Sequence, residues 1–163
     1  MKNSSSSEPT SAPQNVTTVE FSNSGQRQQT VQAPKIVKSE SEWRNQLGSP
    51  AFEITRRDGT EPAFTGAYWD LHEEGLYRCA CCGTALFNSD TKFDSGTGWP
   101  SFSGPVTDEN VSTTEDRSFG MKRVAVSCKR CDAHLGHVFE DGPKPAGLRY
   151  CMNSAALRFV KTG

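Results

Sequence analysis

Four cysteines in two C-x-x-C pairs place the strongest constraint on how this chain folds. Cys79 pairs with Cys82 and Cys128 with Cys131, and 45 residues separate the two pairs. A C-x-x-C turn presents two thiolates on one side of a tight knuckle, and two knuckles supply the four sulfurs of a closed tetrahedral zinc site. We therefore predict a structural zinc ion that joins two distant parts of the chain.

A redox-active C-x-x-C motif is the alternative for either pair taken alone. The thioredoxin type needs a strand–helix–strand context, which this sequence of short β segments lacks. Because all four predicted zinc ligands come from the protein, the metal has no open coordination position and is not expected to be catalytic.

The polar residues of the chain are concentrated at its N-terminus. Apolar residues make up only 34% of the 163 residues, and Ser, Gln, Thr, Asn and Pro account for 22 of the first 35. Such a composition cannot bury enough surface to offset the entropy of folding. We expect a disordered polar tail over residues 1–35 and one folded domain over residues 36–163. A transit peptide is the alternative, but Glu8 and Glu20 fit its acid-poor composition badly.

Charge and hydropathy exclude several kinds of partner. The 18 basic and 19 acidic side chains give a formal charge of −1, whereas a non-specific binder of nucleic acid or anionic membrane is expected to be basic. No apolar run approaches the ~18 residues that span a bilayer, and the N-terminus lacks a secretory pattern. We expect a monomeric, cytoplasmic protein without nucleic-acid or membrane partners, whose six cysteines are thiols or metal ligands.

Helix signals open the domain and β signals follow. Ser39 and Glu42 have the form of a capping box, and Gly48 ends the first helix. Ser49 as N-cap and Pro50 in the first helical position predict a second short helix. Short alternating or β-branched runs then predict strands over residues 76–80, 85–87, 121–128, 137–139, 148–153 and 156–160. The sequence therefore predicts a mainly antiparallel β domain with short N-terminal helices.

Cys151 lies in a strand pattern that sets a thiol among polar side chains. Apolar residues occupy the even positions of residues 148–152, so Arg149, Cys151 and Asn153 share the opposite face of the strand. Arg149 would favour the thiolate, which is the form that attacks electrophiles. A small buried core cysteine is the alternative, and it is the more usual environment of an isolated Cys.

Two further motifs have the form of site components. His134 and His137 lie on either side of a glycine that permits a bend, with Asp141 following, so one histidine could donate a proton while the carboxylate orients it. The loop over residues 95–101 is stiffened by glycine and proline and presents Trp99, an aromatic wall suited to a small methylated group. Structural histidines and a core-capping tryptophan are the alternatives.

Together these motifs resemble the methionine sulfoxide reductase B family. They are Tyr-Arg-Cys-x-x-Cys-Gly from Tyr77, Lys-Phe-Asp-Ser-Gly-x-Gly-Trp-Pro-Ser-Phe from Lys92, Cys-x-x-Cys-x-Ala-His-Leu-Gly-His-Val-Phe-x-Asp-Gly-Pro from Cys128 and Gly-Leu-Arg-Tyr-Cys-x-Asn-Ser from Gly147. The upstream Gly-Thr-Glu-Pro-Ala-Phe-Thr-Gly segment from Gly59 is also similar. The resemblance covers about residues 39–160 and leaves the predicted tail outside.

The resemblance implies an enzyme that reduces the R epimer of methionine sulfoxide, in proteins or free, to methionine. It implies Cys151 as the nucleophile, Trp99 as a wall of the methyl pocket, and His137 with His134 and Asp141 as groups that protonate or orient the sulfoxide oxygen. Arg149 and Asn153 would support the thiolate and the site geometry. The implied fold is two antiparallel sheets leaning together with short N-terminal helices, and a four-cysteine structural zinc occurs in many members.

The chain departs from the family at the position of the resolving cysteine, which takes part in regenerating the reduced enzyme. Many members carry a resolving cysteine in the loop before the tryptophan, where this sequence has Thr97. Cys81 is the only thiol not assigned to zinc or attack, and its place inside a knuckle limits its travel toward Cys151. We expect an external thiol, such as thioredoxin, glutaredoxin or a small thiol, to reduce the oxidised enzyme. A non-catalytic zinc module remains the alternative from another class.

Overall fold

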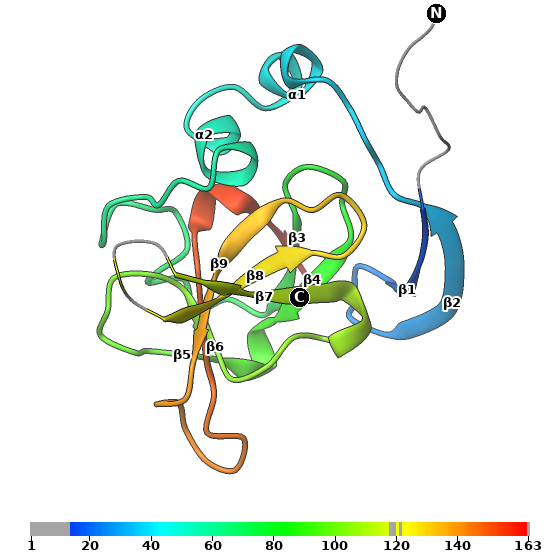
Figure 1. Ribbon diagram of the computed structural model, residues 1–163. Helices are drawn as coiled ribbons and strands as arrows, with labels where there is room; N and C mark the ends of the chain where they lie inside the picture. Colours follow the sequence, from blue (N-terminus) through cyan, green and yellow to red (C-terminus); the bar gives the residue numbers. More distant parts are fainter. Residues whose placement is uncertain (1–13, 118–119, 121, 163) are drawn as a thin grey trace, which may run out of the picture.

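Most of the described chain forms antiparallel β-sheet. The computed structural model describes residues 14–117, 120 and 122–162. A six-stranded sheet has the order β5-β6-β10-β9-β8-β7, and a three-stranded sheet has the order β11-β3-β4 (Figure 1). These strands are β3 (Gly75–Cys79), β4 (Ala85–Asn88), β5 (Lys92–Phe93), β6 (Ser101–Phe102), β7 (Val111–Asp116), β8 (Arg123–Cys128), β9 (His134–Phe139), β10 (Arg149–Met152) and β11 (Leu157–Lys161). The prediction of a mainly β fold with antiparallel sheets is confirmed.

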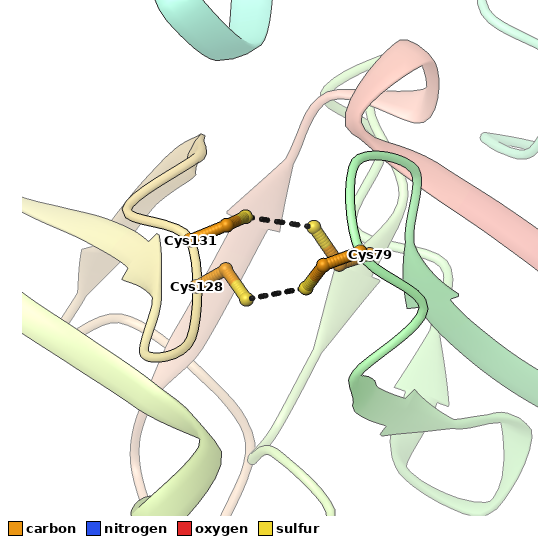
Figure 2. A group of neighbouring side chains, drawn as sticks. Cys79, Cys128 and Cys131 are labelled. Carbon is orange, nitrogen blue, oxygen red and sulfur yellow. Dashed lines mark hydrogen bonds between the residues drawn. The ribbon is translucent and has the colours of Figure 1, made fainter. Parts of the chain in front are cut away.

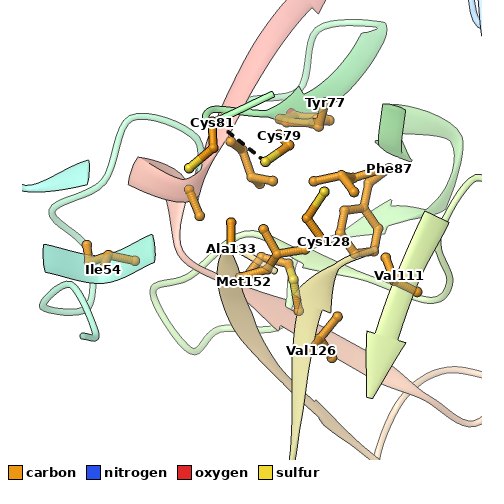
Figure 3. Packing of buried hydrophobic residues seen from close by; sticks show 14 of the residues in the cluster. Ile54, Tyr77, Cys79, Cys81, Phe87, Val111, Val126, Cys128, Ala133 and Met152 are labelled. Carbon is orange, nitrogen blue, oxygen red and sulfur yellow. Dashed lines mark hydrogen bonds between the residues drawn. The ribbon is translucent and has the colours of Figure 1, made fainter. Parts of the chain in front are cut away.

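The two sheets meet across fully buried aromatic rings. Phe102 of the large sheet stacks on Phe87 of the small sheet, with ring centroids 4.5 Å apart. Tyr77, also from the small sheet, meets Phe102 edge to face at 5.1 Å. Offset and edge-to-face contacts add to the free energy of burying each ring. Figure 3 shows Tyr77 and Phe87 in this core, which fixes how the sheets lean together.

The first helix begins and ends as the sequence predicts. α1 covers Glu40–Leu47, and its capping box is complete because Glu42 donates from its backbone to the Ser39 hydroxyl and accepts from the Ser39 N–H. Gly48 ends the helix with a positive φ of 68°. Trp43 is buried on the core side, where the Arg56 guanidinium lies 4.4 Å from the centre of its ring.

Element boundaries differ from the predictions elsewhere. The second helix, α2 (Ala51–Arg56), starts one residue late, with Pro50 as its N-cap and no side-chain capping bond. Strand β9 starts at His134, three residues before the predicted start. Strands β5 and β6 are too short for a periodic pattern, and β7 is a largely exposed, polar strand at the edge of its sheet, so the sequence pattern did not reveal them.

The prediction of a disordered tail through residue 35 is wrong for the described part of that segment. Strands β1 (Asn15–Phe21) and β2 (Arg27–Pro34) form an antiparallel hairpin, while residues 1–13 of the predicted tail lie outside the described residues. Figure 1 shows this hairpin, in blue, at one edge of the molecule. Val19 and Phe21 are buried against β3 and β4. The averaged composition hid a β-branched run whose apolar face is covered by the rest of the domain.

A buried asparagine attaches the hairpin to the domain. The Asn110 side chain is fully buried, accepts a hydrogen bond from the Val19 N–H at 2.8 Å and donates to the Val19 carbonyl at 2.9 Å. It also donates to the Ala85 carbonyl of β4 at 2.8 Å. One amide thus satisfies both backbone groups of Val19, as a neighbouring strand would.

Replacing this asparagine tests the attachment. In Asn110→Ala the three backbone groups lose their hydrogen-bond partners. We therefore expect the free energy of unfolding, measured by urea titration, to fall by about 3 kcal/mol. We also expect the substitution to accelerate amide hydrogen exchange more in β1 than in β8. Asn15→Ala, an exposed change on the same hairpin, serves as the control and is expected to stay within about 0.5 kcal/mol of the parent protein. Equal stability of the two variants would contradict this attachment.

Candidate active site and metal centre

The four cysteines of the two C-x-x-C pairs converge in space. Their sulfurs all lie within 4.8 Å of one another, and the Cys79–Cys131 and Cys82–Cys128 sulfur pairs are each 3.6 Å apart. Figure 2 shows Cys128 and Cys131 on one loop facing Cys79 on the other. A tetrahedral ion with metal–sulfur bonds of ~2.3 Å requires sulfur separations of about 3.8 Å. The cluster therefore fits a four-thiolate metal site.

Both cysteine loops have the same backbone design. In each, the residue after the second cysteine has a positive φ, 83° at Gly83 and 62° at Asp132. That residue donates its N–H to the carbonyl of the first cysteine, at 2.9 Å in both loops. The tight turn directs the two sulfurs of each loop to the same side, as the motif predicts.

The candidate nucleophile lies in the middle of the large sheet. Strand β10 runs between β9 and β6, and Cys151 pairs across the strands with His137 on one side and Ser101 on the other. The predicted alternation is confirmed because Tyr150 and Met152 are buried on the opposite face. Cys151 lines a cavity of about 220 Å³, and most of the other lining residues are polar or aromatic: Thr60, Thr97, Trp99, Arg123, Gly136, His137, Phe139, Arg149, Met152 and Asn153.

Burial controls the acidity of this thiol. It raises the pKa of Cys151, and the charge of Arg149 together with hydrogen bonds from Thr97 and Ser101 lowers it again only in part. The predicted influence of Arg149 has the expected direction, but desolvation of the thiolate outweighs it. In the free protein the thiol is therefore the dominant form at neutral pH, and the thiolate gains population as pH rises.

Trp99 is held by the segment between the helices and the small sheet. Its indole N–H donates to the Glu61 carbonyl at 2.9 Å, and the indole lines the cavity beside Cys151. Glu61 is itself fixed, because its buried carboxylate accepts hydrogen bonds from the backbone N–H groups of Ser154 and Ala155. The same glutamate thus connects the tryptophan loop to the residues that follow β10.

The carboxylate beside His137 is Asp116 and not the predicted Asp141. His137 Nε2 lies 2.8 Å from a carboxylate oxygen of Asp116, which also pairs with Arg123 at 3.4 Å. Asp116 is at the end of β7, two strands from β9 in the sheet, so no local spacing could reveal it. Arg123 adds a cation to the cavity wall, so Asp116 contacts both the His137 ring and a guanidinium.

Asp141 instead pairs with Arg149. The arginine donates from Nε and Nη2 to the two carboxylate oxygens at 2.9 and 3.2 Å, and its guanidinium lies 4.5 Å from the centre of the Phe139 ring. Hydrogen bonding to Arg149, together with its charge, lowers the pKa of the Asp141 carboxyl, and the same hydrogen bonds raise the pKa of Arg149. This two-point contact fixes the guanidinium on the cavity wall near Cys151.

His134 and His137 lie in one strand and not on a bend. Their ring centroids are 5.4 Å apart, and His134 is buried beside a second cavity of about 560 Å³ that shares His137 with the first. Burial lowers the pKa of His134, and the nearby His137 lowers it further. Gly136, between the two histidines, allows β9 to approach β10 closely, since a Cβ there would clash with the Cys151 carbonyl.

Asn153 supports the site from behind. It is 3% exposed, donates to the Leu135 carbonyl at 3.1 Å and accepts from the Glu61 N–H at 3.0 Å. Both bonds hold backbone near the cavity, so the amide positions the walls of the site. The sequence placed Asn153 on the face of Cys151, and the structure also shows it lining the cavity.

Cys81 lies in a different part of the protein from Cys151. It is 6% exposed and packs in the core beside Cys79 and toward Ile54, as Figure 3 shows. Its backbone N–H lies 3.4 Å from the Cys79 sulfur, inside the first cysteine loop. Cys81 lines none of the described cavities that contain Cys151.

Comparison with known proteins agrees with the motifs. A family model described as the SelR domain matches residues 47–161. The peptide methionine sulfoxide reductase MsrB of Herminiimonas arsenicoxydans is 55% identical over 128 residues, which cover 78% of this chain and 93% of the relative. Proteins of the same name from Synechococcus sp. (strain RCC307) and Acinetobacter baylyi are 57% and 55% identical over 124 residues, covering 76% of this chain and 91% and 89% of theirs.

The chain therefore belongs to the SelR domain family, together with these MsrB proteins. The resemblance drawn from the sequence motifs is confirmed. The family match starts at residue 47, so it does not include the β1–β2 hairpin. Among the described residues, no helix is long and apolar enough to cross a membrane.

The raised pKa of Cys151 predicts how alkylation depends on pH. Because only the thiolate reacts with iodoacetamide, we expect the alkylation rate at Cys151 to rise about tenfold from pH 7 to pH 8. Arg149→Ala removes a group that lowers this pKa, so it should slow alkylation at a given pH, while Arg149→Lys should keep most of the rate. Peptide mapping separates Cys151 from Cys81. A rate that is already constant above pH 7 would contradict the raised pKa.

Proposed function

We propose that this protein reduces the R epimer of methionine sulfoxide, in proteins or free, to methionine and so repairs oxidative damage. The observation that carries the proposal is the cavity in which a thiol, an indole and a carboxylate-bound histidine meet, at Cys151, Trp99 and His137. Membership of the SelR domain family supports the same reaction, since the MsrB relatives carry it in their name.

The chemistry requires a nucleophile and an acid at opposite ends of the S=O bond. A sulfoxide sulfur is a poor electrophile until its oxygen is protonated. In the proposed step the Cys151 thiolate attacks that sulfur and forms an S–S bond while a proton reaches the oxygen. The protonated oxygen then passes to the Cys151 sulfur, so that the S–O bond of the substrate and the new S–S bond both break. Methionine leaves, and Cys151 is left as a sulfenic acid, so the cysteine is oxidised by two electrons while the substrate is reduced by two.

The neighbouring residues have roles that follow from their contacts. His137 donates the proton to the sulfoxide oxygen, Asp116 holds its ring, and neutral His134 packs behind it. Arg149, fixed by Asp141, stabilises the thiolate, and Asn153 positions the cavity wall. Trp99 receives the terminal methyl group of the substrate on its ring face. His137, Arg149, Asn153 and Trp99 line the Cys151 cavity, and Asp116, His134 and Asp141 act through their contacts with those residues.

Regeneration requires an external thiol. A first reductant thiol condenses with the sulfenic acid and releases water, and a second reductant thiol displaces Cys151 while the reductant becomes a disulfide. Thr97, hydrogen-bonded to Ser95 at 2.8 Å, stands where many relatives would carry a resolving cysteine. Cys81 is fixed in the core next to the metal cluster, which disfavours travel to Cys151. Thioredoxin, glutaredoxin or a small thiol is therefore the proposed reductant.

A stereochemical assay tests the reaction. With dithiothreitol and a peptide containing racemic methionine sulfoxide, we expect consumption to stop at about half, with the R epimer removed. Cys151→Ser should lose activity by more than about a hundredfold because an alcohol is a far weaker nucleophile than a thiol.

The matched control is Cys81→Ser. This variant should keep full turnover with dithiothreitol, and substrate added without reductant should leave a trappable sulfenic acid at Cys151 in the parent protein. A Cys81–Cys151 disulfide would overturn external regeneration, and full activity in Cys151→Ser would overturn the nucleophile.

We further propose that the four-cysteine site holds zinc. Four thiolates at tetrahedral spacing suit zinc, and a site closed by four protein ligands is structural. When bound, the ion supplies a cross-link between the two cysteine loops and no chemistry at Cys151. Reduced cysteine ligands suit the cytoplasm, where we place the protein, and we propose that it acts there as a monomer.

Loss of one ligand tests the zinc site. Metal analysis of the parent protein should give one zinc per chain, and Cys128→Ser should lose it together with at least about 3 kcal/mol of stability, because metal binding here is part of folding. Cys81→Ser, which alters a neighbouring sulfur outside the cluster, should retain the metal. A metal-free Cys128→Ser with an unchanged unfolding midpoint would show that the ion is not structural.

A further inference from the structure

Phe64 is an exposed aromatic residue held in an unfavourable backbone conformation. Its side chain and backbone are 55% exposed, although exposed large apolar residues are few among the described residues. Its φ of 67° lies in the left-handed region, which bulky side chains rarely adopt. Phe64 belongs to neither hydrophobic core cluster of the described residues, so burial does not account for an aromatic residue at this position. Strain retained at an exposed position is typical of a residue with a function.

The loop that carries Trp99 holds Phe64 in place. The Phe64 N–H donates to the Gly98 carbonyl at 2.8 Å. The ring also lies directly on Gly98, where an added Cβ would come within 2.7 Å of it. Gly98 immediately precedes the tryptophan of the cavity wall. Phe64 is thus fixed, by a hydrogen bond and by packing, to the rim of the proposed active site.

The segment before Phe64 also belongs to that rim. Thr60 lines the Cys151 cavity, and the Glu61 carbonyl holds the Trp99 indole. Behind Phe64, Trp69 packs edge to face with a centroid separation of 5.0 Å, which makes the exposed ring part of a rigid aromatic pair. An aromatic surface therefore continues outward from the cavity wall.

A substrate bound in the cavity has to pass over this surface. Because only two methylene groups separate the sulfur of methionine from its Cα, a sulfur placed at Cys151 keeps the substrate backbone near the mouth of the cavity. The residues on either side of a methionine sulfoxide in a polypeptide then lie over the rim. A free amino acid has no such residues and would leave the aromatic pair uncovered.

We propose that Phe64, supported by Trp69, forms a subsite that binds an apolar residue flanking methionine sulfoxide in a polypeptide substrate. The inference rests on the proposed function and adds a preference within it. The aromatic pair offers apolar area and no charged group, so it favours Leu-like neighbours over glycine. Oxidised methionines in unfolded or partly unfolded segments, which expose such neighbours, are the substrates that this surface fits.

Peptides that differ only at the flanking positions test the subsite. With R-methionine sulfoxide between two leucines or two glycines, we expect Phe64→Ala to lower kcat/KM for the leucine peptide about tenfold, mainly through KM. The same variant should change kcat/KM for N-acetyl-methionine sulfoxide by less than about twofold. Val37→Ala is the matched control, since Val37 is 71% exposed and lines none of the described cavities.

A charge change separates contact from general damage to the loop. In Phe64→Lys, a peptide flanked by glutamates should gain about fivefold in kcat/KM relative to one flanked by lysines, compared with the same ratio in the parent protein. Loop damage cancels in this ratio, and Val37→Lys should leave it unchanged. An unaltered ratio in Phe64→Lys overturns the subsite whatever the absolute rate. An inactive parent protein on N-acetyl-methionine sulfoxide overturns instead the function on which it rests.

Discussion

The rest of the structure depends on the convergence of two cysteine loops that belong to different sheets. Cys79 ends β3 of the small sheet, and Cys128 ends β8 of the large sheet, so the cluster joins the sheets at one point. Strands as short as β5 and β6 contribute few hydrogen bonds to the sheet, and a domain of this size has a limited hydrophobic core. The aromatic contact between Phe87 and Phe102 joins the same two sheets. The cysteine cluster and the aromatic core thus act on one interface.

The active-site geometry follows from strand register. Cys151 faces His137 across β9 and Ser101 across β6, and a slip of one residue would turn the thiol to the opposite face of the sheet. Gly136 allows β9 to approach the Cys151 backbone closely, which a side chain would prevent. Because β9 begins just after the second cysteine loop, the loop that carries Cys128 and Cys131 also sets the position of His137. Structural and proposed catalytic cysteines are therefore mechanically connected without sharing a site.

The features that the sequence predicted correctly are those formed by residues close together in the chain. The capping box at Ser39, the cysteine knuckles and the alternation around Cys151 each involve residues close in the chain, and the structure has all three. The pairing of His137 with Asp116 joins separate strands, and it could not be read from spacing. Proximity in sequence favours Asp141 as the partner of His137, but in the structure both Asp141 carboxylate oxygens accept hydrogen bonds from Arg149.

The hairpin was missed for a different reason. Its strands are polar on average, and the apolar residues Val19 and Phe21 gain their burial from Leu76 and Ala85, far along the chain. Composition measures what a segment can bury alone, whereas this segment is covered by a surface that already exists. The hydrogen bonds of the Val19 backbone also stabilise the hairpin. A hydropathy average does not contain them, because they come from one distant side chain, Asn110.

Burial of Cys151 has opposite effects on the two halves of the proposed cycle. Desolvation raises the pKa of the thiol and so reduces the thiolate present before substrate binds. The thiolate that forms at the moment of attack is correspondingly more basic and a stronger nucleophile. In the proposed cycle the sulfenic acid forms in a cavity whose lining includes the exposed Thr60, and an external thiol would reach it from that side. Among the described residues, no second cysteine lines that cavity, so the proposed regeneration uses the same open side for the substrate and then for the external reductant.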